Sequence, residues 1–274
     1  MQGGHLDIPV LTVDGEQVEH RHDAVASEEP LAIRVVTVDG RRHDVAVTMR
    51  TPGADHELAI GFLVGEGVIG RGDEVETVRT ADNQVDVVLT DEVSFDADAL
   101  RRNVYATSSC GVCGRASLDH LHSLSASSPH GESTLTPDML RRLPTTLRTT
   151  QDVFGATGGL HAAALFTAEG TLRTAREDVG RHNAADKVIG RAYLDQALPA
   201  DDMILLLSGR ASWELMQKAL LAGIPTVAAV GAPSSLAVAL ARRFGQTLIG
   251  FLRGRRFNVY SGAERLDLTA RIQS

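Results

Sequence analysis

MILLLSGRASWELMQKALLAGIPTVAAVGAPSSLAVALARRFGQTLIGFL, residues 203–252, alternates short apolar runs with helical patterns. The apolar runs at 203–207 and 226–230 are typical of strands buried on both faces of a sheet. Helices are expected at 212–221 and 234–244, and a third strand at 248–251. Strand–helix–strand–helix–strand in this order predicts a right-handed βαβαβ unit with a parallel sheet.

Outward from this stretch, the first hundred residues are dominated by strand patterns. Aspartate-glycine pairs at 14–15 and 39–40 predict tight hairpins, because both central turn positions need a positive φ. A third hairpin is expected around residues 81–83, and a helix over 54–69. After a polar loop at 123–133, a strand pair at 160–167 and 171–174, a helix at 183–194 and a further strand at 257–260 are expected.

These patterns predict an α/β protein of two domains. Residues 1–102 form a smaller, strand-rich amino-terminal domain, and residues 103–274 form the α/β core. The 274 residues are 43% hydrophobic and 23% charged, which is typical of a soluble globular protein.

Composition also excludes several classes of protein. The net charge of −8 argues against non-specific binding to duplex DNA, which requires neutralised phosphates. No apolar run approaches the roughly 18 residues that cross a bilayer. Residues 1–10 lack the pattern of a secretory signal, so the cytoplasm is the expected location.

The charge is nevertheless unevenly distributed. Residues 1–30 contain seven acids and one arginine, whereas residues 241–274 contain seven arginines and two acids. The carboxyl-terminal stretch is thus a local +5 on an acidic protein. Such a patch can attract a small polyanion.

Both cysteines lie in one motif, SSCGVCG at 108–114. With C-x-x-C spacing and no secretory signal, Cys110 and Cys113 are expected to be metal ligands, a redox pair or a reactive nucleophile rather than a structural disulfide. A helix that begins near Arg115 would lower the pKa of the thiols and favour the thiolate.

A zinc site is the alternative interpretation of this motif. A structural zinc needs four ligands, which His120 and His122, or His161 or His182, could complete. A zinc nucleobase deaminase would carry H-x-E before P-C-x-x-C, and residues 105–109 have neither the glutamate motif nor the proline. Deaminase chemistry is therefore disfavoured.

Three further polar clusters are candidate ligand-binding positions. The first, at 176–187, places an imidazole and a carboxylate four residues apart on one helical face. The second follows the strand at 203–207, at the edge where parallel sheets bind ligands. The third is an arginine-rich loop between two expected strands, suited to phosphate oxygens. The candidates are Arg181, His182, Asn183, Asp186, Ser208, Arg210, Phe251, Leu252, Arg253, Gly254, Arg255 and Arg256. A G-x-G-x-x-G match at 65–70 follows a helical pattern and is interpreted as a helix stop.

Five segments together resemble the formate dehydrogenase accessory sulfurtransferase family, FdhD. They are SSCGVCG at 108–114, GGLHAAALF at 158–166, REDVGRHNAADKVIG at 176–190, SGRASWELMQKALLAGIP at 208–225 and FLRGRRFNVY at 251–260. The resemblance implies a core similar to that of cytidine deaminases and a cytoplasmic homodimer.

The resemblance also implies a sulfur relay. The family accepts persulfide sulfur from a cysteine desulfurase and passes it to the molybdenum (or tungsten) bis-guanine-dinucleotide cofactor of formate dehydrogenase. By resemblance, Cys110 carries the persulfide, while Cys113 assists release or resolves Cys110 as a disulfide. Arg253, Arg255 and Arg256 would hold the cofactor phosphates, the backbone of 251–256 would shape the site, and the remaining candidates would line it. The alternatives are a cofactor-binding chaperone without sulfur transfer and a zinc-binding, deaminase-like protein.

Overall fold

The computed structural model describes residues 4–70, 72–97, 100, 129 and 134–268. The cysteine motif at 108–114 and the predicted domain boundary between residues 102 and 103 lie outside the described residues. The predicted loop at 123–133 does so too, apart from Pro129. These three expectations stay predictions.

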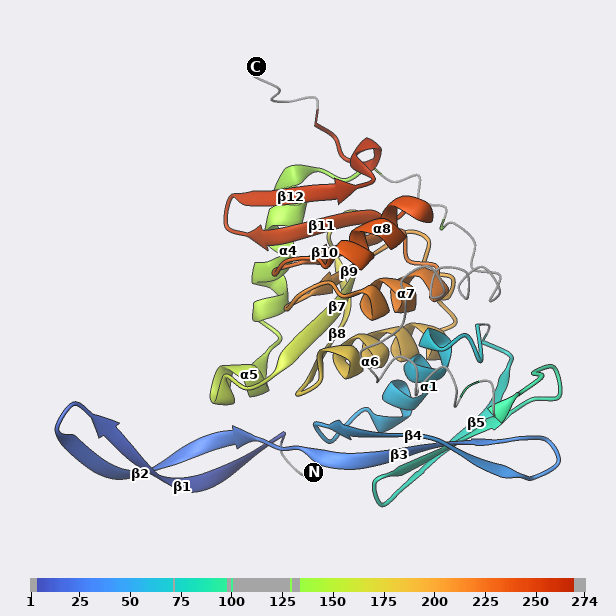
Figure 1. Ribbon diagram of the computed structural model, residues 1–274, viewed down its shortest axis with the longest axis horizontal. Helices are drawn as coiled ribbons and strands as arrows, with labels where there is room; N and C mark the ends of the chain where they lie inside the picture. Colours follow the sequence, from blue (N-terminus) through green and yellow to red (C-terminus); the bar gives the residue numbers. More distant parts are fainter. Residues whose placement is uncertain (1–3, 71, 98–99, 101–128, 130–133, 269–274) are drawn as a thin grey trace.

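A six-stranded sheet forms the centre of the larger part of the molecule (Figure 1). Three of its strands are the predicted parallel strands: β9 pairs with β10, and β10 with β11. The others pair antiparallel at the two edges. In order across the sheet, the strands are β12 (Arg256–Ser261), β11 (Thr247–Arg253), β10 (Thr226–Ala229), β9 (Met203–Leu207), β7 (His161–Thr167) and β8 (Leu172–Asp178).

Helices cover both faces of this sheet, because its central strands are apolar on both sides. Along β7, Ala163 and Leu165 pack into one buried cluster, whereas Ala164 and Phe166 pack into another. The first cluster faces α6 (Arg181–Leu194), α7 (Trp213–Leu221) and α8 (Ser235–Arg243), and the second faces α4 (Pro137–Arg148). The short helix η1 (Ala263–Arg265) follows β12.

Among the described residues, two α-helices were not predicted from the sequence, namely α4 and α5 (Asp152–Thr157). The sequence does carry a start signal for α4. The Thr136 side chain accepts a hydrogen bond from the Met139 N–H, and Pro137 occupies the first turn. Pro144 interrupts the helical pattern.

The amino-terminal strands form a second sheet in the order β4-β3-β6-β5. The three hairpins of the amino-terminal region are those predicted. At residues 82–83 both Asp82 and Asn83 have a positive φ, whereas at the other two turns only Gly15 and Gly40 do. The bounds are β3 (Glu29–Val36), β4 (Arg42–Arg50), β5 (Val75–Ala81) and β6 (Gln84–Leu89). The first hairpin, β1 (His5–Asp14) with β2 (Gln17–Ala26), is a separate ribbon that projects from the body (Figure 1).

Helix α1 (Asp55–Gly65) joins the amino-terminal sheet to the core by crossing α6 at close range. Glycine makes this approach possible. A Cβ on Gly61 would lie 1.8 Å from the Asp186 carbonyl oxygen, and one on Gly190 would lie 1.8 Å from that of Glu57. Helix α1 stops where the G-x-G-x-x-G match begins, with Gly67 at φ 71°. No helix in the described ranges is long and apolar enough to cross a membrane.

Candidate functional site

Six of the predicted site residues line two hollows near the carboxyl edge of β9. This is the edge where the sequence predicted ligand binding. One hollow, the sheet-edge cleft, lies on the side of α4 and α5. The other, the α6–α7 pocket, lies on the side of α1, α6 and α7.

The sheet-edge cleft has a volume of about 660 Å³, within the range of small-molecule sites. Strand ends and loops supply its floor, and α4 and α5 supply one wall. It is lined by Pro144, Thr145, Leu147, Arg148, Gln151, Phe154, Gly158, Gly159, Leu160, His161, Ser208, Gly209, Val230, Arg253 and Gly254. The structure thus brings Ser208 and Arg253, predicted from separate segments, to one cleft.

The polar groups of this cleft suit an anionic ligand. Arg148 and Arg253 line it, and the Arg148 guanidinium lies 4.4 Å from the centre of the Phe154 ring. Burial, together with the neighbouring Arg181 and His182, lowers the pKa of His161 below its usual value. His161 is therefore mostly neutral at pH 7 and can accept a hydrogen bond.

Ser208 is tied to the sheet as well as exposed to the cleft. Its Oγ accepts a hydrogen bond of 2.8 Å from the Ala162 N–H, which leaves the hydroxyl proton available to a ligand. Arg210 is exposed and lines neither hollow.

The arginine-rich loop is the turn between β11 and β12. Arg253 and Gly254, which has φ +60°, line the cleft, whereas Arg255 and Arg256 are exposed and do not. Leu252 is fully buried, so only its backbone is available to a ligand. The preceding Phe251 N–H donates to the Gly231 carbonyl, with Phe251 at φ 55°.

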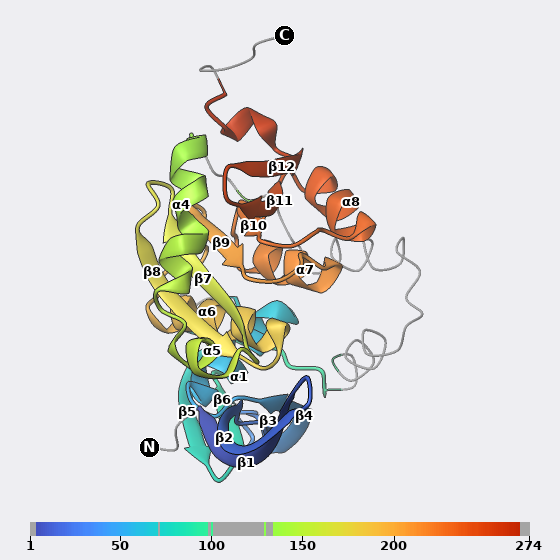
Figure 2. The ribbon, with the colours of Figure 1, turned by 90° about the vertical axis from the view of Figure 1, so that its left-hand side faces the viewer.

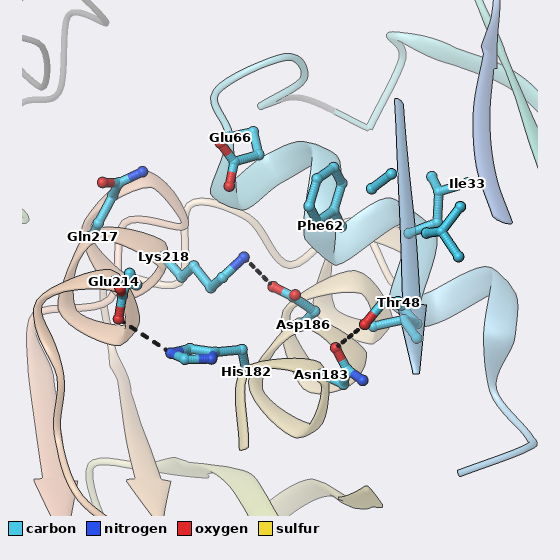
Figure 3. A pocket seen from close by; sticks show the side chains of 13 residues that line it. Ile33, Thr48, Phe62, Glu66, His182, Asn183, Asp186, Glu214, Gln217 and Lys218 are labelled. Atoms are coloured by element: carbon cyan, nitrogen blue, oxygen red, sulfur yellow. Dashed lines mark hydrogen bonds and ion pairs between the residues drawn. The ribbon is translucent and has the colours of Figure 1, made fainter. Parts of the chain in front are cut away.

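The α6–α7 pocket, of about 380 Å³, collects charged side chains against an apolar wall (Figure 3). Three predicted residues line it, namely His182, Asn183 and Asp186. The other lining residues come from β3, β4, α1 and α7, with Glu66 at the end of α1. They are Ile33, Ala46, Val47, Thr48, Leu58, Phe62, Glu66, Glu214, Gln217 and Lys218.

An ion pair spans this pocket between Lys218 Nζ and Asp186 Oδ1 at 2.8 Å. Burial raises the pKa of Asp186 above its usual value, although Lys218 opposes the shift. Burial also disfavours the Lys218 ammonium, but Asp186 and Glu66 outweigh it and raise the pKa of Lys218. Burial likewise raises the pKa of Glu66. The ammonium lies 5.5 Å from the Phe62 ring centre.

A second polar contact joins the amino ends of α6 and α7. His182 Nε2 lies 3.2 Å from Glu214 Oε2 and 3.3 Å from Ser212 Oγ, and the Ser212 hydroxyl donates to Glu214 at 2.9 Å. The hydrogen bond from His182 and the weaker one from Ser212 lower the pKa of Glu214 to about 2. Trp213, between Ser212 and Glu214, packs against the core.

Asn183 is a structural member of the pocket. Its side-chain amide donates to the Met49 carbonyl at 2.8 Å and to Asp178 at 3.0 Å, and its oxygen accepts from Thr48 at 3.1 Å. These bonds attach α6 to β4. Beneath them, buried Asp178 forms an ion pair of 2.7 Å with Lys187.

Sequence reasoning missed Glu66, Arg148, Glu214 and Lys218 as site residues. A signal existed for two of them, because Glu214 and Lys218 are four residues apart and share a face of α7. Arg181, which was predicted, has a buried Nε atom without a hydrogen-bond partner among the described residues.

Comparisons with known proteins identify relatives of this chain. Residues 26–267 match the model of the FdhD/NarQ family. Proteins named "Sulfur carrier protein FdhD" from Streptomyces avermitilis and Sulfurisphaera tokodaii are 50% and 44% identical to this chain. The alignments cover 95% of both chains for the first, and 94% of this chain and 98% of the relative for the second.

The fold is shared with a solved structure from Desulfotalea psychrophila, described as that of a candidate formate dehydrogenase accessory protein. That chain is 24% identical, with a TM-score of 0.76 over 96% of this chain and 99% of its own. The predicted α/β fold is confirmed, whereas the likeness to cytidine deaminases stays a prediction. The family match and the long alignments establish that this chain belongs to the FdhD/NarQ family.

Proposed function

We propose that this chain is a sulfur carrier in the maturation of formate dehydrogenase. It accepts persulfide sulfur from a cysteine desulfurase and transfers it to the molybdenum bis-guanine-dinucleotide cofactor, acting as a cytoplasmic homodimer. The observation that carries the proposal is the 44–50% identity, over nearly the full chain, to relatives named sulfur carriers. The SSCGVCG motif supplies the thiols that such a carrier needs.

In the loading step, the Cys110 thiolate attacks the outer sulfur of the desulfurase persulfide. The donor's sulfur–sulfur bond breaks, the donor cysteine leaves as a thiolate, and Cys110 becomes the persulfide. In the delivery step, the Cys113 thiolate attacks the inner sulfur of that persulfide. Hydrosulfide leaves for the metal, a Cys110–Cys113 disulfide forms, and a cellular dithiol restores the thiols.

The sheet-edge cleft supports the second half of the proposal. The cofactor, which is here a substrate, carries pyrophosphates and guanines. Arg253 and Arg148 would pair with phosphate oxygens, and Ser208 and neutral His161 would form directional hydrogen bonds. The glycine backbones at 158, 159, 209 and 254 would permit close approach.

Intact-mass spectrometry tests the relay directly. After incubation with a cysteine desulfurase and cysteine, the wild-type chain is expected to gain one sulfur mass. Cys110→Ala should gain none and should not activate formate dehydrogenase, whereas Cys113→Ala should be loaded but deliver poorly. Full activation by Cys110→Ala would overturn the sulfur carrier and favour a cofactor-binding chaperone. About one zinc bound per chain through both thiols would favour the zinc alternative.

Calorimetric titration with GDP tests the cleft. Arg253→Ala is expected to weaken binding at least tenfold, because it removes a phosphate partner. Arg79→Ala is the matched control, since Arg79 is exposed on β5 in the other sheet. Equal affinity of the two variants would exclude the cleft as the phosphate site.

A further inference from the structure

The projecting hairpin of residues 5–26, here called the arm, has an unusually apolar surface for a solvent-exposed ribbon. Twelve large hydrophobic side chains are exposed in the described part of the chain, and six of them lie on the arm. Val13 is 64% exposed, Leu6 62% and Leu11 56%. Isolated two-stranded hairpins are at best marginally stable in water, so an arm of this kind needs a partner.

The pairing register places apolar side chains on both faces of the arm. Leu6 pairs with Val25 on one face, and Val13 with Val18 on the other. Each strand has ten residues, so the arm extends about 34 Å at about 3.4 Å per residue. Helix α5 packs against β2. The arm therefore reaches outward from the edge of the sheet-edge cleft, where α5 forms part of the wall.

The arm is also strongly acidic. It carries five carboxylates against one arginine, and in the described part of the chain only Asp7 has an ionic contact, with His22 at 3.8 Å. The carboxylates are Asp7, Asp14, Glu16, Glu19 and Asp23. Its partner surface should therefore be basic, with apolar side chains beside the charged ones.

The β11–β12 turn offers such a surface. Arg255 and Arg256 are exposed, form no ion pair with any described residue and do not line the cleft. The Arg255 carbonyl accepts a hydrogen bond from Arg141 of α4, whose own charge is already paired with Asp138. The Arg141 guanidinium lies 5.9 Å from the ring centre of Phe257, a half-buried aromatic side chain.

The arm and the turn cannot meet within one chain. Both lie on the same side of the molecule but at opposite ends of it, the arm at the bottom and the turn at the top of Figures 1 and 2. A half-turn of a second copy about the viewing direction of Figure 1 would bring each arm against the other copy's turn. Such a contact is isologous, as in most homodimers.

We infer that the arm is a dimerisation arm, which packs on the β11–β12 turn and α4 of a second copy of this chain. The carboxylates of the arm pair with Arg255 and Arg256, and the arm's apolar side chains are covered against the partner. Arg253 remains in the cleft, free for its ligand. The inference names the interface of the proposed homodimer and does not depend on sulfur transfer.

Sedimentation velocity over a concentration series at low salt tests this interface. Wild type is expected to be a dimer. Glu16→Lys/Glu19→Lys on the arm and Arg255→Glu/Arg256→Glu on the turn should each raise the dimer dissociation constant at least tenfold. The combination of all four changes should restore the dimer, because the charges are exchanged. Glu76→Lys/Arg79→Glu on β5 is the matched control and should leave the dimer unchanged.

Leu11→Ser/Val13→Ser is a second, uncharged test and should also dissociate the dimer. A wild type that is monomeric throughout, or a dimer that survives the arm reversals, would overturn the inference. If wild type is monomeric and the arm variants lose binding to the desulfurase, the desulfurase is the partner of the arm instead. Persulfide loading of wild type and the arm variants, measured by intact mass, is a separate readout. A failed dimer interface with normal loading leaves the proposed function intact, and absent loading in wild type contradicts the proposed function alone.

Discussion

Lys218 and Asp186 form an ion pair in which the two residues are only 6% and 2% exposed. Lys218→Met leaves the Asp186 carboxylate buried without its counter-charge. It is therefore expected to lower the free energy of unfolding by about 3–5 kcal/mol, measured by urea denaturation at pH 7. Arg191→Ala is the control, because the Arg191–Asp195 pair is about half exposed and such pairs contribute at most about 1 kcal/mol.

The double variant Lys218→Met/Asp186→Leu separates the charge effect from packing. Removing both charges should recover most of the loss, since a buried pair can often be replaced by apolar groups of similar volume. A double variant as unstable as Lys218→Met alone would contradict this account of the pair.

Glu214 should make stability depend on pH. Its pKa falls from 4.5 to about 2 in the folded protein, so the unfolded chain binds its proton more readily. The stabilisation is thus fully present above about pH 4.5 and is lost as the pH falls toward 2. We expect the difference in urea midpoint between wild type and Glu214→Gln to be largest at pH 7 and to shrink from pH 4.5 to pH 3. A difference independent of pH would contradict the assigned shift.

Among the elements, the crossing of α1 and α6 depends most directly on single atoms. Gly190→Ala would place a methyl group 1.8 Å from the Glu57 carbonyl oxygen. This oxygen belongs to the helix backbone, which cannot move aside by a rotamer change as a side chain can. The two helices must separate, so we expect a loss of at least about 3 kcal/mol in unfolding free energy, or failure to fold. Gly155→Ala in α5 is the control, because a Cβ there meets nothing within 4 Å and alanine favours the helix. Equal stability of the two variants would contradict the close crossing.

Some of the secondary-structure elements could be predicted from the sequence alone, and others could not. Strands β9 and β10 were predictable because Leu205 and its neighbours form uninterrupted apolar runs. Helix α4 was missed although Leu140, Leu143 and Leu147 have helical spacing, since Pro144 lies within it. Ser208 was predictable from its place at the end of a parallel strand, and His182 from its helical spacing with Asp186.

The division into two hollows was not predictable. It depends on which distant segments pack beside these residues, such as Glu66 from α1 and Arg148 from α4. Such neighbours are determined by tertiary packing, which a local sequence pattern does not predict.

For the molecule as a whole, one apolar core joins the two sheets. Ile33 and Val85 of the amino-terminal sheet belong to the same buried cluster as Leu205 of the six-stranded sheet. We therefore expect one cooperative unfolding transition, in which far-UV circular dichroism and hydrogen exchange of β6 and β9 report the same free energy. Ile33→Ala should lower it by about 2–5 kcal/mol for both sheets alike.

Val47→Ala is the control for that substitution, because Val47 lies in the adjacent strand β4 but is 72% exposed. It should change the free energy of unfolding by less than about 0.5 kcal/mol. Two separate transitions, with Ile33→Ala affecting only the exchange of β6, would show instead that the sheets fold independently.

Trp213 gives the protein an optical label of its own. It is the only tryptophan in the chain, and it stands between Ser212 and Glu214 beside the α6–α7 pocket. Indole emission changes in wavelength and intensity with the polarity and charge around the ring. The intrinsic fluorescence of the unlabelled protein therefore responds to changes beside this pocket, such as the entry of a ligand or the loss of the Lys218–Asp186 pair.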